Sequence, residues 1–242
     1  MDKTYIFEEN QLRSFAFTRF SQICGLEKCD GQVASVIEGE AQRIYRKYFC
    51  ARRVKGVVRR FGKRVWRNKR VYAEDREISC SLFARIPEDI VEGVYFYALT
   101  AGALFAEGSD DARNGEAAMN PMEQLYLDIW GTAFLDSGRI FLEQTLLAEE
   151  NHQNENPLFL WGTGPGFYDM DLEECSAFVS VLKPDRIGVD LNESGVLRPE
   201  KSCIGLYLLL NRPFFSDMAC RTCRGSSSGC SFCQLIEGRN KG

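Results

Sequence analysis

Four cysteines near the C-terminus have the spacing of a metal site. The segment CRTCRGSSSGCSFC contains Cys220, Cys223, Cys230 and Cys233 in the pattern C-x2-C-x6-C-x2-C. Two Cys-x2-Cys pairs supply four thiolate ligands for a tetrahedral zinc ion or for an iron–sulfur cluster. The spacing therefore predicts one metal centre, either [4Fe–4S] or zinc, with free thiols or partial disulfides as the alternative. The short central spacer favours a cluster slightly over zinc.

A second candidate site is the glycine-rich segment WGTGPGFYDMDLEE, residues 161–174. A strand-like apolar run precedes it, and acidic residues typical of a helix start follow it. Its glycines leave backbone amides uncovered beside a helix N-terminus, which suits a carboxylate, a phosphate or another polar ligand. The spacing differs from the G-x-G-x-x-G dinucleotide fingerprint. A plain tight turn is the alternative interpretation.

The third feature is a basic stripe, residues 52–70. It contains ten basic and no acidic residues, although the whole chain has a net charge of −4. A basic stripe on an acidic body predicts a docking surface for an acidic protein partner. The residues expected to contact that partner are Arg59, Arg60, Lys63, Arg64 and Arg67. A solvated β-hairpin is the alternative, while the acidic remainder of the chain disfavours nucleic-acid binding.

Composition excludes several classes of function. The single histidine, His152, lies in a polar run that predicts a surface loop, which excludes His-rich metal sites and argues against Ser-His or Cys-His catalysis. No apolar stretch reaches the roughly 20 residues of a membrane helix, and the N-terminus has no signal-peptide core. We therefore expect a cytoplasmic protein without membrane contact, whose ten cysteines serve metal or redox chemistry before disulfides.

The elements that must position these groups alternate irregularly between helix and strand. Helices are predicted over residues 33–50, over about thirty residues after Pro121, and over 171–182. Strands are predicted over 94–102, 157–163, 186–191 and 203–210, with short strands joined by a turn over 52–70. The predicted fold class is α+β, a twisted, mainly antiparallel sheet packed with helices. The expected organisation is a helical and basic β segment (1–80), a core of the same domain (81–215) and a Cys-rich tail (216–242).

Residues 165–202 carry a series of short motifs in a fixed order. They are Pro165-Gly166-Phe167, Asp169, Leu172-Glu173, Leu182, Pro184, Arg186-Ile187-Gly188, Asn192-Glu193-Ser194 and Pro199-Glu200-Lys201-Ser202. In order and spacing they resemble the C-terminal half of the activation domain of cobalamin (vitamin B12)-dependent methionine synthase, as found in its stand-alone bacterial members. The first eighty residues match that family only in outline.

The resemblance implies a methionine synthase activation domain-like fold and a shallow groove for S-adenosylmethionine. The groove would be formed by Thr163, Gly164, Pro165, Gly166, Phe167, Glu193 and Ser194. It also implies docking on a corrinoid or cobalamin-binding methyltransferase protein whose cobalt has oxidised to Co(II). An acidic donor such as flavodoxin or ferredoxin would supply one electron, and the sulfonium methyl group would pass to the reduced cobalt. The chain would then be a reactivation factor and not a complete methyltransferase alone.

The sequence departs from the family at two positions. Gly162 stands where the family has an arginine that would hold the methionyl carboxylate, and Phe167 stands where it has a tyrosine. Loss of a charge-assisted hydrogen bond costs about 2 kcal/mol. We therefore expect a weakened site, unless Arg139 or Arg198 replaces the missing cation. Restoring an arginine at position 162 is expected to tighten binding.

Two other functions stay open at this point. The first is an iron–sulfur or zinc-containing electron-transfer or scaffold protein of corrinoid metabolism that has lost S-adenosylmethionine binding, as Gly162 would suggest. The second is a nucleic-acid-binding protein with a basic patch and a zinc tail. The chain has no Asp-x-His-x-x-Gly motif, the usual lower-ligand signature of cobalamin-binding modules. It is therefore not expected to carry cobalamin tightly itself.

Overall fold

The computed structural model describes residues 2–103 and 120–214. The helices are α1 (Glu9–Cys24), α2 (Gly31–Tyr48), α4 (Pro121–Gln153) and α5 (Cys175–Leu182). The strands are β1 (Asp2–Glu8), β2 (Arg53–Gly62), β3 (Trp66–Arg67), β4 (Arg70–Ala73), β5 (Arg76–Ile78), β6 (Val91–Gly102), β7 (Phe159–Thr163), β8 (Asp190–Leu191), β9 (Leu197–Arg198) and β10 (Lys201–Leu210). Short 3-10 helices span Leu26–Lys28, Lys63–Val65, Ser81–Arg85, Glu88–Ile90, Leu172–Glu174 and Pro184–Ile187.

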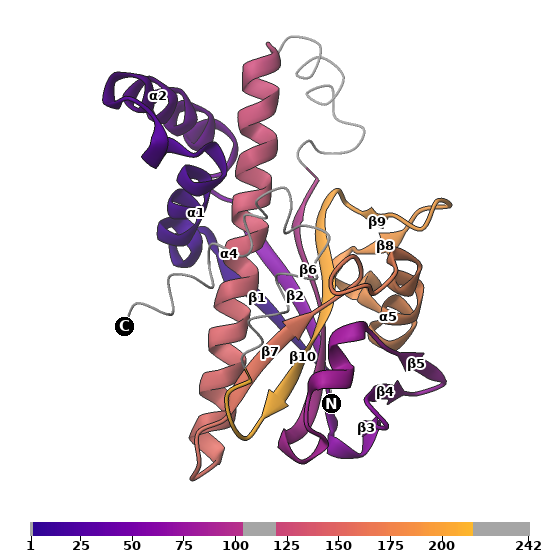
Figure 1. Ribbon diagram of the computed structural model, residues 1–242. Coiled ribbons are helices and arrows are strands. Elements are labelled where there is room, and N and C mark those ends of the chain that lie inside the picture. The colour runs from indigo at the N-terminus through magenta and orange to yellow at the C-terminus, as the bar shows by residue number, and fades with distance from the viewer. Residues whose placement is uncertain (1, 104–119, 215–242) are drawn as a thin grey trace.

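A five-stranded sheet in the order β1-β2-β6-β10-β7 forms the centre of the fold (Figure 1). Every neighbouring pair in it is antiparallel. Residues 93–101 of the middle strand β6 are all buried, as its continuous apolar sequence predicts. The predicted α+β class with a mainly antiparallel sheet is confirmed.

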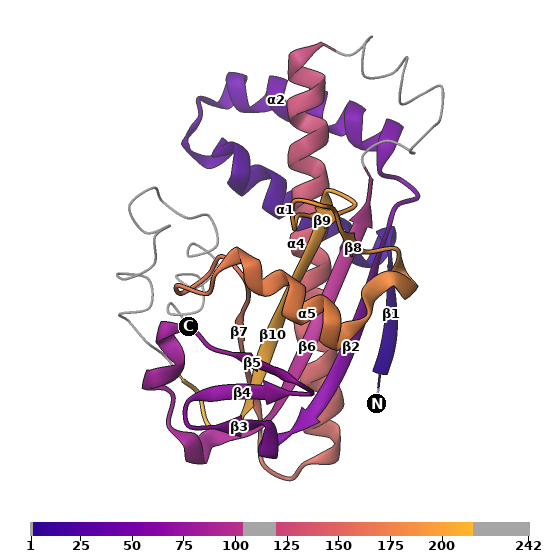
Figure 2. The same cartoon turned by 90° about the vertical axis from the view of Figure 1, so that its right-hand side faces the viewer.

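Two layers cover the sheet. Helices α1, α2 and α4 lie on one face, whereas α5, the small sheet β3-β4-β5 and the β8–β9 hairpin lie on the other (Figures 1 and 2). Because alternate strand residues point to opposite faces, each face has its own apolar core. Tyr97 and Tyr207 belong to the core under α4, while Phe96 and Leu206 belong to the core under α5.

The long helix α4 lies close against the sheet. Asn120 and Glu123 form a capping box at its start, with Pro121 in the first turn. Gly138 faces β2, and a Cβ at this position would come within 2.5 Å of Val54 Cγ1. The absence of a side chain at Gly138 therefore permits the close approach of α4 to β2.

Buried polar side chains fix the helices in place. The Arg19 guanidinium of α1 donates to Asp136 of α4 at 2.6 Å, and both side chains are almost fully buried. Glu150, near the end of α4, accepts from Arg60 of β2 at 2.6 Å and from the Tyr95 hydroxyl of β6. Loss of one partner of a buried pair typically costs about 3–5 kcal/mol, which applies to Arg19 and Asp136, whereas Arg60 is 44% exposed and its pair with Glu150 contributes less.

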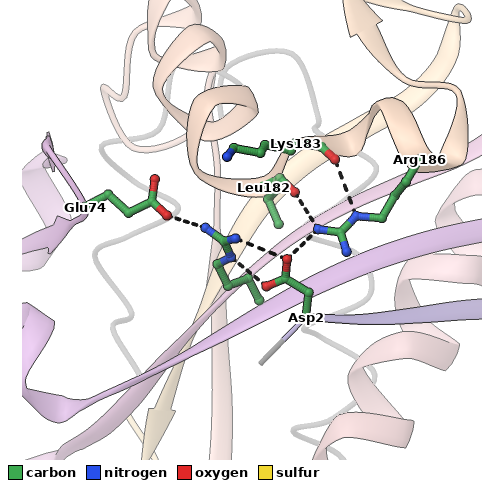
Figure 3. A network of polar contacts seen from close by, with 6 residues as sticks. Asp2, Glu74, Leu182, Lys183 and Arg186 are labelled. Carbon is green, nitrogen blue, oxygen red and sulfur yellow. Dashed lines mark hydrogen bonds and ion pairs between the residues drawn. The ribbon is translucent and has the colours of Figure 1, made fainter.

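An ion-pair network joins the N-terminal strand to the segment after α5 (Figure 3). The Asp2 carboxylate accepts from the guanidinium groups of Arg59 and Arg186, each at 2.6 Å. Arg59 also pairs with Glu74, and Arg186 donates to the Leu182 carbonyl at 3.0 Å. The hydrogen bond from Arg59 lowers the pKa of Asp2 to about 2, with a smaller contribution from Arg186 and in spite of partial burial. Arg186, a residue of the motif series, therefore has a structural contact in this fold.

Some local predictions need correction. Residues 186–191 were expected to form a strand, but Pro184 opens a 3-10 turn between left-handed residues at Lys183 and Gly188, and only Asp190–Leu191 pairs. The first half of the basic stripe is one ten-residue strand inside the main sheet. His152 is exposed, but it lies in the last turn of α4 and not in a loop.

Other expectations fall on parts of the chain with no structural description. The Cys-rich tail (216–242) lies outside the described residues, as do residues 107–116, whose polar sequence EGSDDARNGE predicts a loop. The division at residue 80 stays a prediction, although β1 and β2 pair within the same sheet as β6. Across residues 2–103 and 120–214, no helix has the length and apolar character needed to cross a membrane.

We predict that Asp2→Asn removes a pH-dependent part of the folding free energy. Since the pKa of Asp2 is depressed, its stabilisation is present above the ordinary value of 3.8 and is lost as the pH falls through about 2. Between about pH 5 and about pH 2.5, the urea unfolding free energy of the native chain should fall by about 1–2 kcal/mol more than that of the variant. Asp185→Asn, at an exposed position nearby, is the control. Equal pH dependence of Asp2→Asn and the native chain would contradict the prediction.

Candidate functional site

The glycine-rich segment forms a closed turn between β7 and α5. Gly166 N donates to Met170 O at 2.8 Å, and Phe167 N donates to Gly164 O at 3.0 Å. Gly166 has a φ of 87°, a conformation that favours glycine. The turn thus uses the amides of Gly166 and Phe167 itself, which corrects the expectation that they are free to bind a ligand carboxylate.

A pocket of about 440 Å³ opens beside this turn. It is lined by Gly166, Tyr168, Asp169, Met170, Asp171, Leu172 and Glu173. Three of these residues are acidic and none is basic, so the pocket suits a cationic group. Burial, followed by the charges of Asp171 and Glu77, raises the pKa of Glu174 just outside the pocket. Negative charge is therefore concentrated where the 3-10 turn leads into α5.

The residues predicted from the turn contribute unequally to this pocket. Gly166 lines it, whereas Gly164, Pro165 and Phe167 are not among its lining residues. Thr163 is buried at the end of β7. The pocket therefore lies on the helix side of the glycine turn, closer to α5 than the sequence suggested.

Glu193 and Ser194 lie at the tip of the β8–β9 hairpin. Asn192 Oδ1 accepts from Ser194 N at 3.0 Å and from Val196 N at 2.9 Å, which holds the tip in its turn. Both predicted residues are exposed, and neither lines the pocket. The hairpin and the end of β7 lie apart in both views (Figures 1 and 2). A groove that joins them stays a prediction.

Gly162 lies on β7 directly opposite Tyr207 of β10. Tyr207 is fully buried, and its hydroxyl donates to the Arg139 carbonyl of α4 at 3.4 Å. Since directly paired residues of antiparallel strands share a face, a side chain at position 162 would point towards α4 and away from the layer that contains α5. A Cβ there would approach the Tyr207 ring to 2.9 Å. The expectation that an arginine at this position would tighten binding does not fit this geometry.

Arg139 and Arg198, which were considered as replacements for the arginine missing at position 162, lie in different parts of the fold. Arg139 lies on α4, on the side of the sheet that Tyr207 faces. Arg198 lies on β9 and pairs with Glu200. Neither lines the pocket beside the glycine turn.

The basic stripe does not present its cations on one surface. Arg59 and Arg60 are successive residues of β2, so their side chains point to opposite faces of the sheet. Arg59 pairs with Asp2 and Glu74, whereas Arg60 pairs with Glu150. Lys63 pairs with Glu92, with 3.7 Å between Lys63 Nζ and Glu92 Oε2. Internal carboxylates therefore offset much of the charge that the sequence assigned to docking. Arg64 and Arg67 follow on the 3-10 turn and β3, where Arg67 lies over the Tyr72 ring.

The predicted metal ligands Cys220, Cys223, Cys230 and Cys233 lie outside the described residues, so the metal centre stays a prediction. Within the described ranges, no group of three or more His, Cys, Asp or Glu side chains is arranged to hold a metal ion. Burial raises the pKa of the Cys80 thiol to about 11 and that of Cys203 to about 12. These two thiols are poorly suited to nucleophilic chemistry.

Comparison with known proteins gives a match of fold. No protein-family model and no curated protein matches the chain. The solved structure of the MetH reactivation domain bound to AdoHcy is similar, with a TM-score of 0.59 and 13% sequence identity over 89% of this chain and 80% of that chain. The likeness is one of fold alone. It confirms the predicted activation domain-like architecture, whereas membership of the family stays a prediction.

The acidic lining of the pocket was missed from the sequence. Asp171 and Glu173 were interpreted as residues that open a helix, and Glu173 also as a member of the motif series, but neither was predicted to line a pocket. The available signal was the position of three acidic residues, Asp169 among them, directly after a glycine turn.

We predict that Gly162→Arg destabilises the fold. The new Cβ must displace the Tyr207 ring, and overpacking of this kind typically costs about 1–3 kcal/mol. Gly62→Arg is the matched control, because Gly62 also lies on a strand of the sheet and has nothing within 4 Å of an added Cβ. Urea unfolding of both variants tests the prediction, and an unchanged stability of Gly162→Arg would show that Tyr207 moves freely.

Proposed function

We propose that the chain binds S-adenosylmethionine and supports reductive methylation of a cobalamin held by a partner methyltransferase. The observation that carries the proposal is the likeness of fold, over 89% of the chain, to a reactivation domain bound to AdoHcy. The motif series at residues 165–202 supports it, because those residues build the glycine turn, α5, the β8–β9 hairpin and the start of β10.

The pocket beside the glycine turn is the proposed binding place for the cationic part of the ligand. S-adenosylmethionine supplies a methyl group on a positively charged sulfur. Asp169, Asp171 and Glu173 would stabilise that charge, and Leu172, which is 69% exposed, would offer an apolar contact. Gly166 permits a close approach because it has no Cβ. The ligand carboxylate must bind elsewhere, since the amides of Gly166 and Phe167 donate within the turn.

Calorimetric titration of the full chain with S-adenosylmethionine and S-adenosylhomocysteine tests this proposal. The two ligands differ by one methyl group and the sulfonium charge. If the acidic pocket recognises that charge, S-adenosylmethionine should bind about 3–10-fold more tightly, or about 0.6–1.4 kcal/mol. Asp171→Asn should remove most of this preference, because Asp171 lines the pocket and its side chain caps no helix.

Asp185→Asn is the control for the titration, since Asp185 is exposed and lies outside the pocket. A preference that is the same in Asp171→Asn and the native chain would contradict the role of the pocket. Failure of both ligands to bind at millimolar concentration would contradict the proposed function.

The proposed partner is a corrinoid-binding methyltransferase protein. We further propose that an acidic electron donor, such as flavodoxin or ferredoxin, docks on the chain. Arg64 and Arg67 support docking of an acidic protein, because neither takes part in the ion pairs found among the described residues. Docking would then be centred on the 3-10 turn and β3, and not on the central strand β2.

A second candidate function is an electron-transfer or scaffold protein of corrinoid metabolism that has lost the ligand. The position of Tyr207 favours it, because a Cβ at position 162 would come within 2.9 Å of the Tyr207 ring, so that an arginine there requires the ring to shift. The same titration separates the two candidates. Retained S-adenosylmethionine binding excludes the scaffold alternative.

A further inference from the structure

The chain turns back along the outer edge of the sheet after β10. Strand β10 ends at Leu210, which pairs with Phe159 at the start of β7. The next residues reverse direction, and the ring of Phe214 packs edge-on against Trp161 in the middle of β7, with 6.3 Å between the ring centroids. The chain therefore leaves the described structure heading from the start of β7 towards the glycine turn.

Trp161 belongs to an aromatic surface at that edge. Its ring centroid lies 5.6 Å from that of Tyr168 and 6.3 Å from that of Phe83. Trp161, Tyr168 and Phe214 are each half-buried. Strand β7 is the last strand of the main sheet, so its outer side has no strand partner among the described residues. Exposed strand edges with apolar side chains are usually covered, because they otherwise promote association.

We propose that the C-terminal segment, residues 215–242, docks on the outer edge of β7 and on the aromatic surface of Trp161, Tyr168 and Phe214. The segment begins at this surface, since Phe214 is already packed there. Five residues separate Phe214 from Cys220, and the six steps from one Cα to the other span at most about 20 Å. This length of chain is enough for the cysteine motif to reach the glycine turn.

Charge complementarity supports the same placement. The residues between Cys220 and Cys233 include two cations, Arg221 and Arg224, and no acid. The pocket at the far end of the proposed path is lined by three carboxylates. Docking would bring the arginines of the cysteine motif to this acidic rim. The inference does not require S-adenosylmethionine binding, although the docked arginines would compete with that ligand for the same carboxylates.

Hydrogen exchange of the full chain tests the docking. The double variant Arg221→Glu/Arg224→Glu should release the segment, so that the amides of β7 and of residues 166–173 exchange about tenfold faster, equivalent to about 1.4 kcal/mol. Arg239→Glu/Lys241→Glu, a charge reversal beyond the cysteine motif, is the matched control and should leave these amides unchanged. Strand β1, at the opposite edge, should be unchanged in both variants. Equal exchange at β7 in the native chain and the first variant would overturn the proposal.

A paramagnetic metal gives an independent readout. Co²⁺ added to metal-free full chain should broaden the amide resonances of β7 and the glycine turn and leave those of β1 sharp. Co²⁺ that binds to the full chain without broadening the amide resonances of β7 would overturn the docking. Loss of S-adenosylmethionine binding with the β7 effects intact would reject the proposed function and leave the docking unaffected.

Discussion

Strand β6 is enclosed on both edges and on both faces, and this enclosure determines the arrangement of the other elements. Its backbone groups are out of reach of water along residues 93–101, so they must pair with β2 on one side and β10 on the other. Its side chains alternate between two apolar cores, which requires a covering layer on each face. The helical layer and the α5 layer are both consequences of that requirement.

The enclosure leaves little room for chemistry inside the sheet. The buried polar groups Arg19 and Asp136 are engaged with each other, and the buried carboxylate of Glu150 pairs with the more exposed Arg60. The candidate pocket lies instead beyond β7, the edge strand, where the chain leaves the sheet and begins α5. At that place the backbone turn is closed by its own hydrogen bonds, so the side chains after it are what a ligand would meet.

Much of the fold could be predicted from local sequence patterns. The continuous apolar run at 94–102, Pro121 ahead of a long amphipathic segment, and the acids before Cys175 each signal one element without help from the rest of the chain. Strand β2 was harder to predict, because four cations in its sequence obscure the pattern of three fully or almost fully buried valines, Val54, Val57 and Val58. The partners of Arg59 and Arg60 are 57 and 90 residues away in the sequence, and nothing local indicates them. The same holds for Gly162, whose crowding comes from Tyr207 on a later strand.

The central claim is that a cationic ligand binds at the acidic pocket beside the glycine turn. The most direct measurement is an amide chemical-shift map of the isotope-labelled full chain titrated with S-adenosylmethionine. The account predicts shifts centred on Gly166, Asp169, Asp171 and Glu173, with little change at Gly62 on β2. Shifts centred on a different surface, or no shifts at saturating ligand, would contradict it.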